Sequence, residues 1–130
     1  MLNKVKKIPL KEIKNTSGNI IKYIDKEKNF FKKFGEVYFS EIKKGYVKGW
    51  NLHKKCYCLI TVPFGSVEFT LMNFKKTKKK IFRISRKKPE ILLIPPLVWF
   101  KFKSKSQISV VANLINLKHD PKETLKMSIK

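Results

Sequence analysis

Eight short runs of β-branched and aromatic residues follow one another between residues 37 and 116, and turn-forming residues separate them. This spacing is typical of an all-β sandwich or barrel, and no run shows the longer period of a helix. In one run Val67, Phe69 and Leu71 alternate with Glu68 and Thr70, so one side of that strand faces a core. We therefore expect an antiparallel β-barrel with strands at 37–42, 46–53, 56–62, 66–74, 80–85, 91–94, 98–103 and 108–116.

The chain of 130 residues has the length of one domain. We predict an N-terminal arm with first strands at 1–33, a barrel core at 34–116 and a C-terminal tail at 117–130. Within the arm, 20–24 resembles a strand. In the tail, Asp120 stands before Pro121, where it is a candidate cap for a short turn. Turn signals between strands include the Pro63-Phe64-Gly65 stretch and a lysine block at 75–80, which we expect to be exposed at a rim.

The net charge of +22 invites a nucleic-acid-binding hypothesis. However, all but two of the 31 basic residues are lysines, whereas base readout and bidentate phosphate contacts favour arginine. Ala112 is the only alanine, and isoleucine, asparagine and phenylalanine are abundant, as AT-rich codons would produce. We attribute the lysine surplus mainly to this coding bias. No segment has the apolar length of a membrane span or a signal peptide, so the sequence predicts a cytoplasmic protein without membrane association.

The two cysteines, Cys56 and Cys58, lie two positions apart on a predicted strand. Their side chains would project in the same direction without bridging each other, and no further cysteine completes a metal set. We interpret both as reduced packing residues.

Several stretches resemble the RmlC-like cupins related to dTDP-4-dehydrorhamnose 3,5-epimerase and to the dTDP-sugar 3,4-ketoisomerases of the WxcM-like and FdtA-like type. They lie at 34–40, 47–55, 62–67, 94–99 and 112–123, in the family's order. The resemblance implies a cupin jelly-roll barrel, commonly paired into a homodimer, whose open mouth holds a dTDP-linked 4-keto sugar. For the dimer, 20–24 is our candidate for an exchanged strand.

The family motif also indicates which chemistry to expect. The epimerase sequence Arg-Gly-x-His corresponds here to Lys48, Gly49, Trp50 and Asn51, so the epimerase base is absent. The ketoisomerases resemble this chain more closely, because their second histidine, two residues later, is kept as His53. The active-site lysine of the epimerases is replaced as well, by Cys58.

Both kinds of enzyme abstract a proton next to a carbonyl, which needs a base and a group that stabilises the enolate oxygen. We predict His53 as the base and Asn51 as a hydrogen-bond donor near the keto oxygen. Their two-residue spacing on a strand points both side chains into the barrel. His119, beyond the last predicted strand, fits a structural or interface role better.

The remaining candidates are residues that we expect to bind the substrate. Lys48 and Lys55 are candidates for holding the diphosphate, with Lys48 preferred, and Trp99 is a candidate for stacking on a base or sugar ring or for closing one end of the barrel. A metal-dependent cupin needs several converging ligands, and the position after Trp99, where one would stand, is Phe100. We expect no metal and no cofactor.

Three hypotheses follow from these observations. The first is a nucleotide-sugar isomerase or epimerase of surface-polysaccharide biosynthesis. The second is a non-catalytic cupin that binds a sugar nucleotide or a partner enzyme, because Asn51 has replaced a histidine. The third is a nucleic-acid-binding barrel, for which charge is the only support.

Overall fold

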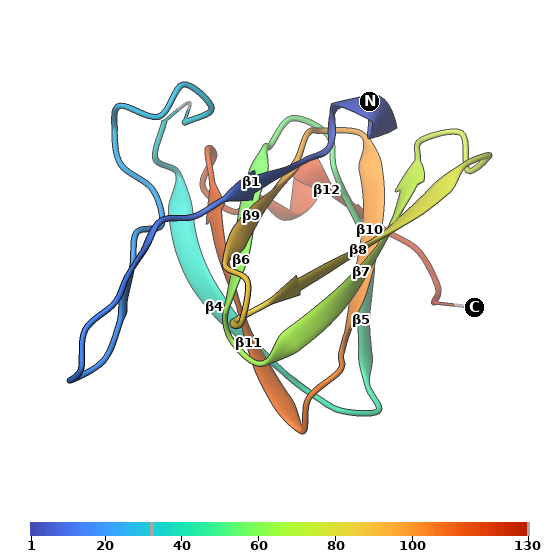
Figure 1. Ribbon diagram of the computed structural model, residues 1–130. Helices are drawn as coiled ribbons and strands as arrows, with labels where there is room; N and C mark the ends of the chain where they lie inside the picture. Colours follow the sequence, from blue (N-terminus) through green and yellow to red (C-terminus); the bar gives the residue numbers. More distant parts are fainter. Residues whose placement is uncertain (32, 130) are drawn as a thin grey trace.

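A barrel of two antiparallel sheets that face each other forms the body of the molecule (Figure 1). The structure is a computed structural model that describes residues 1–31 and 33–129. Positions 32 and 130, in the predicted arm and tail, lie outside the described residues. The fold confirms the predicted all-β antiparallel barrel.

Each of the two main sheets has five strands. The first contains, in spatial order, β1 (Lys6–Pro9), β9 (Glu90–Ile94), β6 (Cys58–Phe64), β11 (Ile108–Ile115) and β4 (Glu36–Lys43). The second contains β12 (Thr124–Lys126), β5 (Val47–His53), β10 (Val98–Ser104), β7 (Ser66–Asn73) and β8 (Lys79–Ser85). A separate pair is formed by β2 (Glu12–Ile13) and β3 (Ile20–Ile21), and two short 3-10 turns, η1 (Leu2–Lys4) and η2 (Pro121–Glu123), lie near the ends. None of the helices in the described part of the chain has the length and apolar character that a membrane crossing requires.

The main core lies between the two sheets, where every second side chain of the central strands is buried. On β7, Val67, Phe69 and Leu71 are fully buried, as the alternation predicts. They pack with buried residues of the opposite sheet, such as Ile60 and Leu92. Burial of this apolar area stabilises the packing of the two sheets against each other.

Two smaller apolar clusters cover the outer faces of the sheets. Residues of the N-terminal arm, including Tyr23 and Phe30, pack on the outside of the first sheet, and the Tyr23 hydroxyl donates to the carbonyl of Leu59. On the outside of the second sheet, the cluster consists of Trp50, Leu52, Met72 and Trp99, with Leu125 and Met127 packed against it.

All eight predicted runs contain a strand, but three local expectations were wrong. Pro63 lies inside β6 rather than in a turn, opposite a register shift between Val110 and Ala112, where an irregular ladder leaves room for a residue without an N–H. Cys56 precedes β6, because its N–H bonds to the Glu123 carboxylate instead of to a neighbouring strand. The predicted strand at 20–24 is limited to β3, which pairs with β2 of the same chain.

Other predictions about turns are confirmed. The block at 75–80 is exposed, forming the turn between β7 and β8 and the start of β8. The Asp120 side chain accepts a hydrogen bond from the N–H of Lys122 and so caps η2, with Pro121 in its first turn.

Candidate active site

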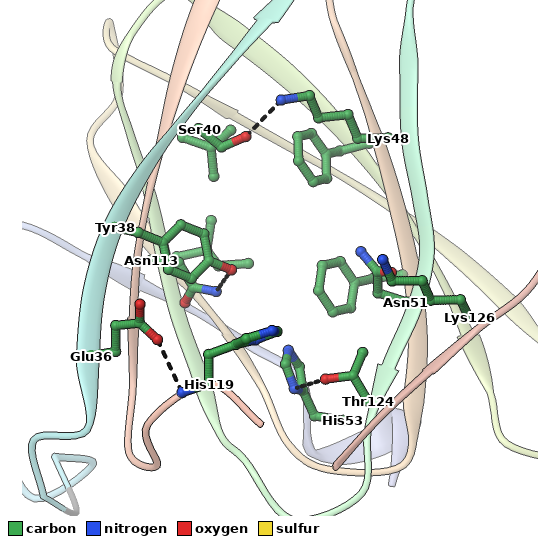
Figure 2. A pocket seen from close by; sticks show the side chains of 14 residues that line it. Glu36, Tyr38, Ser40, Lys48, Asn51, His53, Asn113, His119, Thr124 and Lys126 are labelled. Carbon is green, nitrogen blue, oxygen red and sulfur yellow. Dashed lines mark hydrogen bonds between the residues drawn. The ribbon is translucent and has the colours of Figure 1, made fainter. Parts of the chain in front are cut away.

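A cavity of about 290 Å³ opens at one end of the barrel, between the two sheets (Figure 2). Strands β4 and β11 supply one wall, β5, β10 and β12 supply the other, and the segment after β11 reaches the same space. The polar lining comprises Glu36, Tyr38, Ser40, Lys48, Asn51, His53, Asn113, His119, Thr124 and Lys126.

Strand β5 presents three of these side chains, two by regular alternation and one through a local irregularity. Asn51 and His53 face the cavity, as their spacing predicts, while Trp50 and Leu52 pack on the outer face. The pairing with β10 shifts at Asn51, so Lys48 also faces inward, although strict alternation would have turned it away.

Gly49 makes this irregularity possible. Its φ of +114° suits glycine, and a Cβ there would lie 2.6 Å from the carbonyl oxygen of Phe100 and 2.7 Å from the Cα of Lys101. The glycine of the family motif is therefore required by close packing of β5 against β10.

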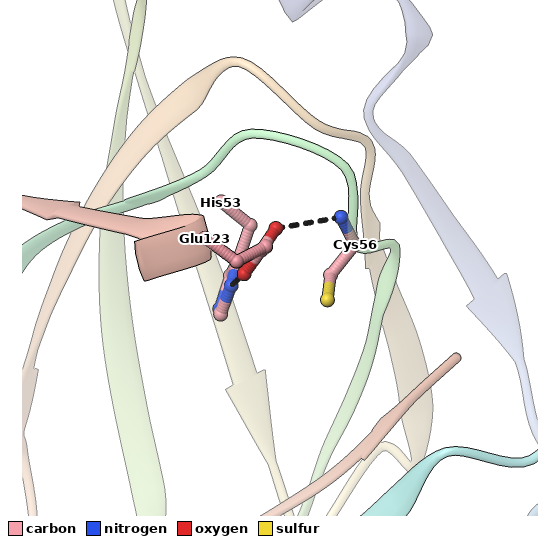
Figure 3. A group of neighbouring side chains, drawn as sticks. All are labelled: His53, Cys56 and Glu123. Carbon is pink, nitrogen blue, oxygen red and sulfur yellow. Dashed lines mark hydrogen bonds and ion pairs between the residues drawn. The ribbon is translucent and has the colours of Figure 1, made fainter. Parts of the chain in front are cut away.

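The His53 ring is held by a carboxylate that the sequence did not single out (Figure 3). His53 Nδ1 lies 2.7 Å from Glu123 Oε1, while Glu123 Oε2 accepts hydrogen bonds from the N–H groups of Lys55 at 2.8 Å and Cys56 at 2.9 Å. Both side chains are about nine-tenths buried. The position of β12 against β5, with Thr124 opposite His53, brings the two groups together.

Electrostatics keep this carboxylate ionised. Burial alone raises the pKa of Glu123, but the hydrogen bonds from the His53 ring and from the N–H groups of Lys55 and Cys56 outweigh it and lower the pKa to about 2. Because an ionised Glu123 can only accept, Nδ1 of His53 carries the hydrogen and donates it to Oε1, which leaves Nε2 as the ring nitrogen that can act in the cavity.

His53, Cys56 and Glu123 also form the one potential metal-ligand group found among the described residues, with donor atoms within 4.8 Å of one another. Burial, followed by the charge of Glu123, raises the pKa of the Cys56 thiol to about 11, so it stays protonated. The carboxylate and Nδ1 already bond to each other. These contacts suit a hydrogen-bonded network that orients the imidazole better than they suit a metal centre.

The opposite wall carries groups that sequence reasoning placed elsewhere or missed. His119 belongs to the cavity lining, because the segment after β11 folds back and its N–H donates to Glu36 Oε1 at 3.0 Å. Tyr38 accepts a hydrogen bond from Asn113 Nδ2 at 2.9 Å. Asn113 is only 2% exposed, and its Oδ1 has no hydrogen-bond partner within the described residues.

Two lysines reach the cavity. The Lys48 amine donates to Ser40 Oγ at 2.9 Å and to the carbonyl of Glu41 at 2.5 Å. Lys126, on β12, lines the same cavity and takes part in none of the ion pairs found in the described ranges. Sequence reasoning missed Lys126 because three residues at the end of a lysine-rich tail give no strand signal.

The structure does not bring the last two predicted residues into this cavity. Lys55 faces a separate surface depression together with Lys54, Lys118 and Lys122, and its backbone N–H serves Glu123. Trp99 packs on the outer face of the second sheet, where the Lys76 amine lies 5.6 Å from its ring centroid. Of the two roles considered for Trp99, this position favours packing.

The barrel is similar to the solved structures of several nucleotide-sugar enzymes. A dTDP sugar isomerase from Desulfovibrio desulfuricans is 25% identical and has a TM-score of 0.91, with 96% of this chain and 84% of that chain covered. A mutant of the 3,4-ketoisomerase QdtA from Thermoanaerobacterium thermosaccharolyticum, with asparagine in place of a histidine and in complex with TDP-4-keto-6-deoxyglucose, is also 25% identical. Its TM-score is 0.83, with 96% of this chain and 88% of that chain covered.

More distant likeness extends to the epimerases. A dTDP-4-dehydrorhamnose 3,5-epimerase from Bacillus anthracis has a TM-score of 0.86 at 14% identity, covering 98% of this chain and 80% of that chain, and so shares the fold. No curated protein matches the chain by sequence. The model of the family described as FdtA, WxcM-like, C-terminal, matches residues 3–127. Since this match spans nearly the whole sequence, the chain belongs to the FdtA (WxcM-like, C-terminal) family.

Proposed function

We propose that this protein is a dTDP-4-keto-6-deoxyhexose isomerase of surface-polysaccharide biosynthesis that moves a proton next to the ketone, with His53 as the base. The observation that carries the proposal is the hydrogen bond between His53 Nδ1 and an ionised Glu123 at the wall of a polar cavity. Among the possible reactions we favour 3,4-ketoisomerisation. The structural relatives at 25% identity include a 3,4-ketoisomerase, and Asn51 occupies the position of the epimerase base.

The pair of His53 and Glu123 has the properties of a general base. The carboxylate fixes the ring orientation and its tautomer, and its charge stabilises the imidazolium that forms when Nε2 takes a proton. A negative charge beside the ring is most effective at a buried position, and both side chains are about nine-tenths buried.

The other cavity groups suit the rest of such a substrate. The Asn51 amide donates a hydrogen bond toward the keto oxygen. Lys48 and Lys126 supply positive charge for the diphosphate. Lys55 and Trp99 are not part of this proposal, because neither lines the cavity.

The second candidate is a cupin that binds a sugar nucleotide without converting it. The presence of Asn51 where the relatives' motif has histidine favours this alternative. It retains the same cavity and the same lysines, so only turnover separates it from the first candidate.

Conversion of dTDP-4-keto-6-deoxyglucose, followed by proton NMR, tests the proposal, with thymidine diphosphate binding measured by calorimetry in parallel. We expect the wild type to yield the 3-keto isomer and His53→Asn to lose turnover by about 10²-fold or more while it keeps its affinity for the nucleotide. Lys54→Gln, at the exposed next position, is the matched control and should behave as the wild type. Nucleotide binding without turnover in the wild type would favour the second candidate.

A further inference from the structure

His119 faces His53 across the cavity. Its backbone N–H, not its ring, makes the hydrogen bond to Glu36, and neither ring nitrogen has a hydrogen-bond partner among the described residues. Figure 2 shows the His119 ring directed across the cavity toward the ring of His53. The two imidazoles come from opposite walls, one from β5 and one from the segment after β11.

A ketoisomerisation needs more than one proton carrier. One proton leaves C3 and another returns at C4, while the two oxygens exchange roles as hydroxyl and carbonyl, so a proton must also reach O4 and leave O3. While the His53 ring holds the carbon-derived proton, it is not free to serve the oxygens. A second group that can both give and take a proton near neutral pH fits this need, and histidine is the side chain with that property.

The other titratable groups of the cavity are less suited to this task. Glu36 accepts the backbone N–H of His119, and the Lys48 amine is occupied by Ser40 and the Glu41 carbonyl. Burial raises the pKa of Tyr38, which keeps its hydroxyl protonated.

The remaining polar groups are excluded on chemical grounds. Glu123 lies behind His53 and is hydrogen-bonded to it, the Lys126 amine is assigned to the diphosphate, and Asn51 has an amide that donates hydrogen bonds but does not release protons.

We propose that His119 is the second acid–base residue of this site and carries protons to and from the sugar oxygens while His53 serves the carbons. This inference rests on the ketoisomerase function proposed above. It also gives a chemical reason why the site can function with asparagine at position 51: the chain supplies a second imidazole from the opposite wall.

The proton transfers balance without any co-reactant. His53 takes the proton from C3, the electron pair of that bond forms a C3=C4 double bond, and the carbonyl π electrons move to O4, which takes a proton from the His119 imidazolium. Neutral His119 then takes the proton from the O3 hydroxyl, whose bonding pair forms the C3=O3 carbonyl. The C3=C4 pair takes the proton back from His53 at C4. Both imidazoles return to their starting states.

The test compares two rates in D₂O for wild type and His119→Asn: deuterium entry at C3 of recovered substrate, and formation of the 3-keto product. We expect the ratio of product to exchange to fall at least about tenfold in His119→Asn, because His53 still removes the carbon proton while the oxygens lose their carrier. Lys118→Gln, at the exposed preceding position, is the control and should keep the wild-type ratio. Substitution of the ring leaves the backbone hydrogen bond to Glu36 in place, and His119→Gln provides a second variant.

Three results would overturn the inference. Wild-type turnover in both His119 variants would show that the ring takes no part. An equal loss of exchange and product with unchanged nucleotide binding would place His119 in the carbon transfer instead. A wild-type protein that shows neither exchange nor product would overturn the proposed function as well, which distinguishes that failure from the other two.

Discussion

The orientation of His53 depends on a residue 70 positions later in the chain. Glu123 fixes the ring through one oxygen and binds two backbone N–H groups through the other, so a single carboxylate joins the end of β5 to the C-terminal segment. Glu123 therefore orients the ring that we propose as the base and also joins the C-terminal segment to the end of β5.

The first prediction concerns the dependence of stability on pH. The hydrogen bonds to the carboxylate lower the pKa of Glu123 from an ordinary 4.5 to about 2 in the folded state, so the ionised form stabilises the fold. Because the folded pKa is the lower one, this stabilisation is complete above about pH 5 and is lost as the pH falls toward about 2.

Urea unfolding of wild type and Glu123→Gln measures this effect. At neutral pH we expect the variant to unfold with about 1–3 kcal/mol less free energy, because an amide cannot accept all three hydrogen bonds. The difference should shrink steadily between about pH 5 and about pH 3. A difference that stays constant over this range would mean that the charge of Glu123 does not stabilise the fold.

At the scale of elements, β5 combines a register shift with a glycine that the packing requires. We predict that Gly49→Ala costs more stability than Gly45→Ala, although both residues have positive φ. A Cβ at Gly49 would collide with the backbone of β10, whereas nothing lies within 4 Å of a Cβ at Gly45. Thermal unfolding should show about 1–2 kcal/mol of loss for Gly45→Ala and clearly more for Gly49→Ala. Equal losses would contradict the packing explanation.

The central strands were predictable because each buries alternate side chains, as Val67, Phe69 and Leu71 show. The short strands β1 and β12 were not, since they have only four and three residues and gain their structure from pairing with longer strands.

The site was predictable to the same extent. The family motif singles out Asn51 and His53, and local alternation on β5 predicts their shared orientation, whereas the places of Glu123 and His119 depend on how the tail folds back, which no short pattern contains.

For the whole molecule, the positive charge opposes association of two copies of the chain, whereas exposed apolar side chains favour it. Only three lysines, Lys7, Lys28 and Lys103, form ion pairs in the described ranges, and the +22 charge is the excess that remains after every acidic residue has been counted. An N-terminal arm containing β2 and β3 projects from the barrel in Figure 1, and it exposes Ile13 and Ile20. A two-stranded ribbon of this kind gains stability by packing against another surface.

We therefore predict a homodimer that involves this arm and strengthens with salt. The distance over which charges repel falls from about 10 Å at 0.1 M salt to about 3 Å at 1 M, so light scattering should show more dimer as salt increases. Ile20→Ser should shift the equilibrium toward monomer, while Tyr46→Ser, an exposed aromatic residue in the turn before β5, should not. A monomeric wild type at every salt concentration would contradict this prediction.

In the proposed function, His53 removes a proton next to the ketone of a dTDP-linked sugar. Incubation of dTDP-4-keto-6-deoxyglucose with the protein in D₂O, followed by mass spectrometry and NMR, tests it most directly. We expect the wild type to introduce deuterium at the carbon next to the ketone and His53→Asn not to do so, although both bind thymidine diphosphate. A wild type that binds the sugar nucleotide and introduces no deuterium, or a His53→Asn variant that exchanges as fast as the wild type, would contradict it.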